Sequence, residues 1–207
     1  PADALILDLE DAVGPTEKAA ARDLVAQALK DGGFGMREVT VRINALDTEW
    51  GEADLEVAAA AGPDAIVVPK VGRPEDLHAV ERRMEAVGAP ASTKLWAMME
   101  TPLGVLGARE IAAATPRLAC LVMGTNDLVK ELEAEHTESR AEVTPALGIC
   151  LLAARAHGLA ILDGVCNAYQ DAEANRAACA MGRALGFDGK TLIHPAQLEI
   201  ANEEFAP

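Results

Sequence analysis

The sequence predicts an α/β fold, a (β/α)8 TIM barrel of which seven strands lie within this chain. Seven short apolar runs each end on a charged or hydrogen-bonding residue: LILDLEDAV, VTVRIN, AIVVPK, KLWAMME, LACLVMGTND, AILDG and TLIHP. Segments with apolar residues at helical spacing separate these runs. Parallel strands buried on both faces have such continuous apolar runs, and strands that alternate with helices favour a parallel sheet.

The helices between the strands follow from spacing and from glycine stops. The first is predicted over 16–30, where Leu24 and Leu29 lie on one face, and Gly32, Gly33 and Gly35 end it. Later helices are predicted over these ranges: 52–61, 74–87, 103–114, 141–157 and 168–185, with a final helical turn after TLIHP.

The number of strands predicts that one strand is missing. A closed barrel has eight strands and typically about 250 residues, and Pro1 lies directly before a strand. We therefore expect the first strand and its helix to lie upstream of Pro1. The alternative is an open doubly wound sheet, but no GxGxxG motif follows any strand, so the barrel is favoured.

Composition indicates one acidic domain over residues 1–207. Half of the 207 residues are apolar, which is enough for a sizeable core, and the formal net charge is -15. Such a charge argues against nucleic acid and anionic membranes as partners. No apolar run reaches the roughly 18 residues of a membrane span. The four cysteines show no CxxC pairing and are expected to be reduced, so a cytoplasmic location is predicted.

Alternation within each strand predicts which side chains reach the mouth of the barrel. Asp127 follows Gly124 in a loop, and Asp163 and His194 end the last two strands. Asp8 lies lower in the barrel, where a buried hydrogen-bond acceptor is expected, and His194, before Pro195, is expected to cap the final helix. The residues expected to face inward are Ile6, Asp8, Glu10, Thr40, Arg42, Asn44, Ile66, Val68, Lys70, Trp96, Met98 and Glu100.

The acidic side chains at the mouth form a cluster whose negative charge must be compensated. It comprises Glu10, Asp11, Glu100, Asp127 and Asp163. Crowded carboxylates repel one another, so they must protonate, pair with cations or hold a metal. Magnesium, with oxygen ligands that include one or two carboxylates, fits best. Arg42 offers a planar fork for a carboxylate or enolate oxygen, and Lys70 could act similarly or, less favourably, form a Schiff base.

At this point the motifs resemble a known family. DLEDAV with a following KxxAR, then VRIN, VPKV, ETPLG, GTNDL, LDGV and GFDGKTLIHPAQ, are similar in order to the beta subunit of citrate lyase and its relatives. Those relatives include malyl-CoA, citramalyl-CoA and citryl-CoA lyases and malyl-CoA thioesterases, within the metal-dependent aldolases. The resemblance covers nearly the whole chain and implies an α/β barrel.

The resemblance also implies roles for individual residues. Glu100 and Asp127 would bind Mg²⁺, while Glu10 and Asp11 would hold metal-bound waters and act as catalytic residues. Arg42 would be catalytic and contact the thioester or keto-acid oxygens. The remaining substrate-binding residues are Gly124 and Thr125, through their backbones, and Lys70.

The activity implied is reversible Mg²⁺-dependent cleavage of a 3-hydroxyacyl-CoA into an acyl-CoA and a 2-keto acid, in a homotrimer or homohexamer. Alternatives are a thioesterase on the same site, a 2-keto-acid aldolase, and a non-catalytic subunit of a citrate lyase-like complex. The resemblance further implies an N-terminal arginine-bearing strand and a C-terminal lid, and neither is expected between Pro1 and Pro207. After Asp-Gly, the segment CNAY departs from the family pattern.

Overall fold

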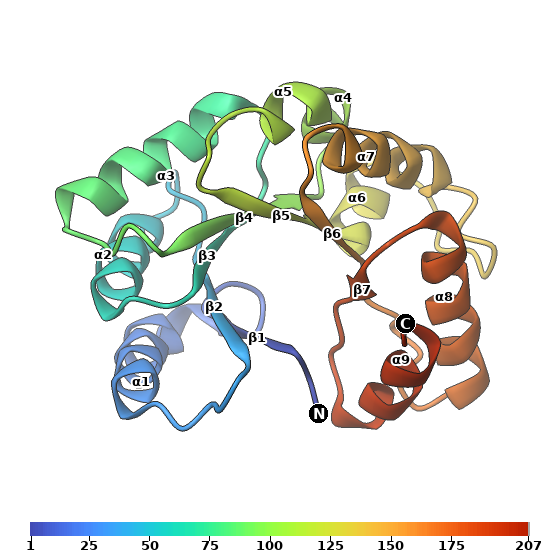
Figure 1. Cartoon of the computed structure of the whole chain (residues 1–207), viewed down its shortest axis with the longest axis horizontal. Coiled ribbons are helices and arrows are strands. Elements are labelled where there is room, and N and C mark those ends of the chain that lie inside the picture. Colours follow the sequence, from blue (N-terminus) through green and yellow to red (C-terminus); the bar gives the residue numbers. More distant parts are fainter. Residues whose placement is uncertain (207) are drawn as a thin grey trace.

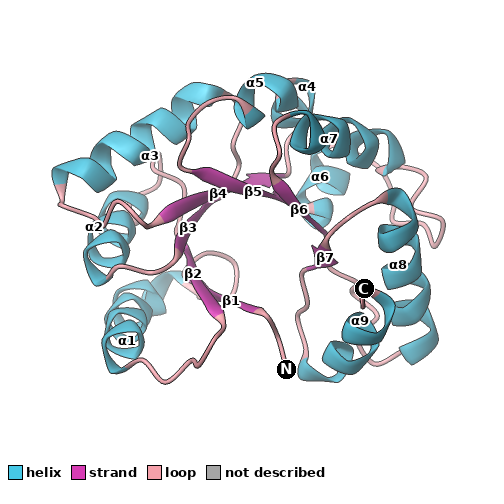
Figure 2. Cartoon of the chain, viewed as in Figure 1, coloured by secondary structure: helices cyan, strands magenta, loops and turns pink. Residues whose placement is uncertain are grey.

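The computed structural model describes residues 1–206 as a curved parallel sheet with helices on its outer side (Figure 1). The strands follow chain order from one edge to the other, and all neighbours are parallel. They are β1 (Ala4–Asp8), β2 (Glu38–Arg42), β3 (Ala65–Val68), β4 (Lys94–Met99), β5 (Leu118–Met123), β6 (Ala160–Asp163) and β7 (Gly189–Lys190). Figure 2 shows this sheet as an arc with β1 and β7 at its ends. The α/β class and the seven parallel strands are confirmed, and the arc is a partial barrel.

The helices largely follow the predicted order. They are α1 (Lys18–Asp31), α2 (Gly51–Ala61), α3 (Pro74–Ala86), α4 (Pro102–Leu106), α5 (Ala108–Ala112), α6 (Thr125–Glu131), α7 (Thr144–Ala156), α8 (Ala172–Leu185) and α9 (Leu198–Glu204), with 3-10 turns at Pro15–Glu17 and Pro195–Gln197. The helix predicted over 103–114 is two helices that meet at Gly107. Asp127 was predicted in a loop and instead lies in the first turn of α6.

The last strand differs from its prediction. TLIHP, at 191–195, was expected to be the strand, but β7 is Gly189–Lys190 and the chain leaves the sheet at Thr191. There the backbone N–H of Thr191 donates to the carbonyl of Asp163 at 3.0 Å. That bond belongs to the pairing of β6 with β7, and residues 191–193 beyond it line a cavity at the mouth of the sheet.

Two apolar layers lie on opposite faces of the sheet. Val41, Leu95 and Leu121 belong to the layer between sheet and helices, whereas Trp96 and Met98 belong to the inner layer. Inward placement is therefore confirmed for Trp96 and Met98.

The prediction for β3 was wrong. Ile66 and Val68 pack toward the helices, and Ala65 and Val67 lie in the inner layer. AIVV has no polar residue to mark its faces, and the chain turns at Lys70, whose φ is 51°. Lys70 is therefore a poor guide to the orientation of the strand before it.

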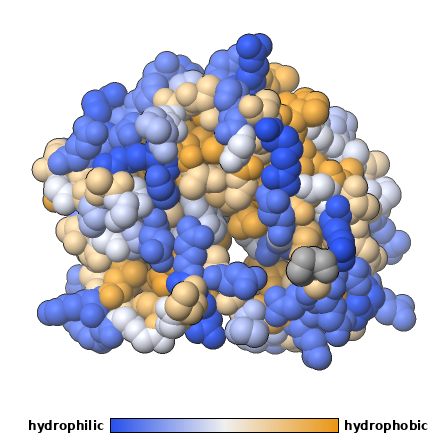
Figure 3. All heavy atoms as spheres, viewed as in Figure 1, coloured by the Kyte–Doolittle hydropathy of each residue, from blue (hydrophilic) through white to orange (hydrophobic). Residues whose placement is uncertain are grey.

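The surface and the cysteines fit the compositional expectations. No helix within residues 1–206 is long and apolar enough to cross a membrane. Cys120, Cys150 and Cys179 are buried, Cys166 is half-buried, and none forms a disulfide. Figure 3 shows hydrophilic side chains over much of one face and apolar surface near α4 and α7, where Leu106 and Leu152 are exposed.

Candidate active site

A cavity of about 400 Å³ lies at the carboxyl ends of the strands. Its wall contains six of the predicted site residues: Asp11, Arg42, Glu100, Gly124, Thr125 and Asp127. They come from the ends of β1, β2, β4 and β5, as expected for parallel strands whose carboxyl ends share one edge. Glu10 and Lys70 do not line this cavity.

Arg42 is held in one orientation by Asp8. Nε of Arg42 donates to Oδ1 of Asp8 at 2.7 Å, and Nη2 donates to Oδ2 at 2.5 Å. The third nitrogen, Nη1, lies 3.0 Å from Glu10 and 3.2 Å from Asp11. Burial is the largest effect and disfavours the charge of Arg42. The hydrogen bonds to Asp8, together with the charges of Asp8, Glu10 and Asp11, outweigh it and raise the pKa of Arg42. Arg42 is thus a fixed cation in the cavity.

Asp8 is a residue whose importance the sequence understated. Its expected role was a structural acceptor, and it does accept the backbone N–H groups of Glu10 at 2.9 Å and Ala12 at 3.1 Å. It also orients Arg42 and lines the cavity. Burial would raise the pKa of Asp8, but the Arg42 hydrogen bond and charge lower it overall.

Glu10 has an unsatisfied oxygen. Its Oε2 atom is buried 3.0 Å from Nη1 of Arg42 but is not aligned for a hydrogen bond, so it has no hydrogen-bond partner within residues 1–206. Burial, and then the charges of Asp11 and Asp8, raise the pKa of Glu10 to about 7 against the opposing effect of Arg42. Burying a carboxylate oxygen without a hydrogen-bond donor costs free energy of folding, unless a bound group supplies the missing interaction.

Glu100 is buried at the end of β4 with little compensation. It is 1% exposed, and its Oε1 accepts one backbone N–H, that of Lys70, at 2.7 Å. Burial, with the charges of Glu10 and Asp127, raises the pKa of Glu100 to about 8. A Cβ on Gly124 would overlap the Glu100 side chain, so only glycine allows this approach.

These residues fit a hard divalent cation. The carboxyl groups of Glu100 and Asp127 both line the cavity and can supply oxygen donors, and Glu10 adds a buried oxygen without a hydrogen-bond partner. No group of three or more His, Cys, Asp or Glu side chains within residues 1–206 converges as a metal site. Magnesium commonly takes only one or two protein carboxylates and keeps several waters, so the predicted pair matches its preference.

Two residues predicted to face the mouth lie elsewhere. Asp163 was grouped with the rim acids, but it pairs with Arg140 and Lys190 at 2.5 and 2.7 Å. Its Oδ2 would lie 2.9 Å from a Cβ on Gly182 of α8, so it faces the helix layer. Asn44 also turns toward the helices, because its backbone and side-chain amides donate to Asp54 on α2.

The loops after β6 and β7 supply a wall that the sequence did not predict. Asn126 and Asn167 exchange side-chain hydrogen bonds of 3.1 and 2.9 Å across it. Tyr169 stacks on His194 with ring centroids 4.8 Å apart. His194 also accepts the Ala196 N–H at 3.2 Å, which confirms its predicted capping role. GTNDL contains Asn126, so this motif was the available signal.

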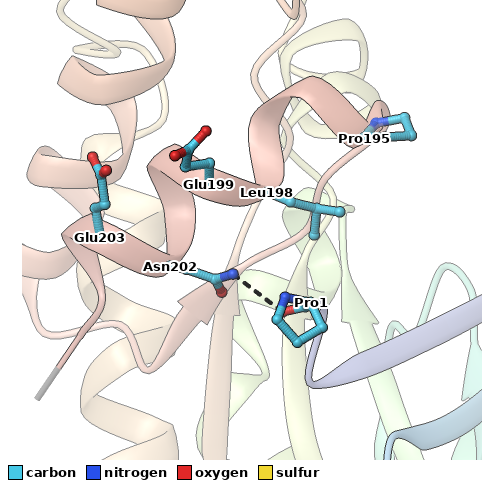
Figure 4. Close-up of a pocket in the computed structure, with 6 residues that line it drawn as sticks. All are labelled: Pro1, Pro195, Leu198, Glu199, Asn202 and Glu203. Atoms are coloured by element: carbon cyan, nitrogen blue, oxygen red, sulfur yellow. Dashed lines mark hydrogen bonds between the residues drawn. The ribbon is translucent and has the colours of Figure 1, made fainter.

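A second hollow, of about 520 Å³, lies between Pro1 and α9 (Figure 4). Asn202 donates to the carbonyl of Pro1 at 3.1 Å there. Among the described residues, the ionisable side chains in its wall are those of Glu199 and Glu203. With acids alone and none of the predicted site residues, it offers no chemistry comparable to that of the first cavity.

The fold and the site identify the class of protein. The model of the HpcH/HpaI aldolase/citrate lyase family matches residues 1–195, and the chain belongs to this family. It is 56% identical over 206 residues to a (3S)-malyl-CoA thioesterase of Cereibacter sphaeroides, covering 100% of this chain and 70% of that one. It is 40% identical to citrate lyase subunit beta of Escherichia coli K12 over 216 residues, with the same coverage.

A solved structure shares the arrangement. The citrate lyase beta subunit from M. tuberculosis, complexed with oxaloacetate and magnesium, superimposes with a TM-score of 0.82 at 31% identity. The match covers 100% of this chain and 88% of that one. The predicted family resemblance is confirmed.

Proposed function

We propose that this chain is a Mg²⁺-dependent enzyme that hydrolyses the thioester of a 3-hydroxyacyl-CoA of the malyl-CoA type. The observation that carries the proposal is one cavity that joins a fixed Arg42 to the carboxylates of Glu100 and Asp127. The identity of 56% to a (3S)-malyl-CoA thioesterase favours hydrolysis. Carbon–carbon cleavage to an acyl-CoA and a 2-keto acid is the second candidate, supported by the 40% identity to citrate lyase subunit beta.

Arg42 would serve either reaction. In hydrolysis, water adds to the thioester carbonyl, the C–S bond breaks and the thiolate leaves as CoA after taking a proton. In cleavage, the hydroxyl loses its proton, the neighbouring C–C bond breaks and an acyl-CoA enolate forms. Negative charge develops on the thioester oxygen in both cases, and a guanidinium already held by Asp8 stabilises it without reorganisation.

Other residues of the site would hold the metal ion and the carboxylate end of the substrate. Glu100 and Asp127 would bind Mg²⁺, and Glu10 and Asp11 would orient waters beside it. Bound there, the ion would supply Lewis-acid polarisation of substrate oxygens. The backbones of Gly124 and Thr125 would receive the substrate carboxylate, and Lys70 would add positive charge near the mouth.

The test is an assay that separates the two products. Malyl-CoA is supplied with Mg²⁺ or with EDTA, and free thiol and glyoxylate are both measured. Hydrolysis gives thiol without glyoxylate, whereas cleavage gives glyoxylate without thiol. Glu100→Ala should lose at least about 100-fold in kcat/KM, while Glu135→Ala, at an exposed position, should not change it.

Other outcomes would replace the proposal. Neither product from malyl-CoA, with condensation of free 2-keto acids, would favour an aldolase, and no activity at all would favour a non-catalytic subunit. We also propose a cytoplasmic enzyme that assembles as a homotrimer or homohexamer. Light scattering after size exclusion measures that assembly, and a monomer would contradict it.

A further inference from the structure

Lys18 begins α1, yet its ammonium group is buried at the carboxyl end of β1. The residue is 5% exposed. Nζ donates to the carbonyls of Leu9 at 2.8 Å and Glu10 at 2.7 Å, and to Oδ1 of Asn44 at 2.8 Å. It also lies 5.1 Å from the ring centroid of Trp50. Within residues 1–206, Lys18 makes no ion pair with a carboxylate.

A buried ammonium without an ionised partner is unusual because its desolvation costs several kcal/mol. Here three oxygen acceptors and an aromatic face use its three protons and its charge. Two of those acceptors are consecutive main-chain carbonyls, and the second belongs to Glu10 itself. Arg22, the other cation of this motif, instead pairs with Asp54 at 2.8 Å.

The segment that Lys18 grips also carries the acids beside Arg42. Asp8 accepts the N–H groups of Glu10 and Ala12 from the cavity side. Lys18 holds the carbonyls of Leu9 and Glu10 from the helix side. Asp8 therefore binds the N–H groups of the turn, and Lys18 binds its carbonyl groups. From this turn the side chains of Glu10 and Asp11 reach Nη1 of Arg42.

We propose that Lys18 is a positioning residue that sets the orientation of Glu10 and Asp11 at the active site. It touches neither substrate nor metal and acts through the main chain of the turn. The inference rests on the proposed function, in which Glu10 and Asp11 orient waters around Mg²⁺.

The first measurement is Mg²⁺ binding by calorimetry to the whole chain. Lys18→Met should weaken Mg²⁺ binding by about 10- to 100-fold, which is the usual loss when a residue that orients the groups around a metal is replaced. Lys30→Met is the matched control, since Lys30 is exposed on the same helix, and its affinity should equal that of the wild type. Wild-type affinity in a folded Lys18→Met protein would overturn the inference. Should Lys18→Met not fold, Lys18→Gln is measured in the same way.

A double-mutant cycle on kcat/KM separates positioning from general destabilisation. Lys18→Met should cost about 10- to 100-fold in the wild type but less than about threefold in Glu10→Gln, where the group being positioned is already altered. Equal costs in both backgrounds would overturn the inference. A wild type that binds no Mg²⁺ and cleaves no thioester would instead refute the proposed function, and this inference with it.

Discussion

Two buried carboxylates at strand ends, Asp163 after β6 and Glu100 after β4, have opposite surroundings. Asp163 is 0% exposed and Glu100 is 1% exposed. Asp163 accepts from Arg140, Lys190 and the Gly164 N–H, whereas Glu100 accepts one backbone N–H. Burial would raise both pKa values, but the cations lower that of Asp163, while that of Glu100 rises to about 8. The carboxylate of Asp163 has cations and a backbone donor as partners, whereas that of Glu100 has one backbone donor.

The largest expected effect is on stability at Asp163. Asp163→Asn leaves Lys190, with its side chain 1% exposed, without its counter-ion, and should lower the free energy of unfolding by about 3–5 kcal/mol. Urea denaturation near pH 7 measures it. Glu203→Gln removes an exposed partner of Arg176, and water and salt screen that pair, so its effect on stability should be much smaller. Equal losses of unfolding free energy in the two variants would show that the buried ion pair stabilises the fold no more than the surface ion pair does.

A glycine packs against each carboxylate and allows a matched pair of substitutions. Gly124→Ala places a methyl group on the Glu100 side chain and should destabilise the protein by about 1–3 kcal/mol and reduce Mg²⁺ binding. In Gly182→Ala the new Cβ lies 2.9 Å from Oδ2 of Asp163, but alanine favours helix by about 1 kcal/mol, so the net change should be smaller. Melting temperatures with and without Mg²⁺ compare them. Loss of Mg²⁺ binding in Gly182→Ala alone would reverse the assignment of the two carboxylates.

The pH dependence of stability should reveal Asp163. Its folded pKa is lowered, so its stabilisation is complete above the unfolded value of about 3.9 and is lost as pH falls through the folded pKa. The stability difference between wild type and Asp163→Asn should stay constant from pH 7 to 5 and narrow below pH 4, by at most about 1.4 kcal/mol per pH unit. Denaturation curves at pH 6, 5, 4 and 3 check this. A difference that widens in acid would show that the carboxylate is not held ionised.

The smallest stability change is expected at Glu100. Because burial and neighbouring acids disfavour its charge, Glu100→Gln should alter the stability of the metal-free protein by less than about 1 kcal/mol. The rise in melting temperature on adding Mg²⁺ should disappear, since the ion stabilises only a fold that binds it. Thermal melts with Mg²⁺ and with EDTA measure both effects. A large loss of stability in EDTA would mean that Glu100 is a structural group like Asp163.

The strands and the main site residues could be predicted because both depend on local patterns. Buried parallel strands require apolar runs, and a polar residue at the end of such a run reaches the shared edge, which located Arg42 and Glu100. The sequence could not show which way a strand-end side chain turns. Asp163 and Asn44 were expected at the mouth, but Arg140, Lys190 and Asp54, which are distant in sequence, draw them to the helix side.

The cavity wall after β6 and β7 was missed for a related reason. TLIHP has the pattern of a strand, but β7 is Gly189–Lys190, and residues 191–193 line the cavity instead of continuing the sheet. Lys18 shows the same limit, because two of the partners of its ammonium group are the main-chain carbonyls of Leu9 and Glu10. Every residue has a main-chain carbonyl, so the pattern of side chains cannot show which carbonyls will accept a hydrogen bond.

The Asn126–Asn167 pair is an electrically neutral link at the edge of the cavity, whose wall includes Asn126. Each amide donates to the other, at 3.1 and 2.9 Å, and neither side chain titrates. The ion pairs of Arg42 weaken as salt rises or as acids protonate, but this reciprocal bond responds to neither. The loop after β6 and the start of α6 therefore stay joined over a range of pH and ionic strength in which the charges a few residues away change, and the shape of the cavity is decoupled from its charge.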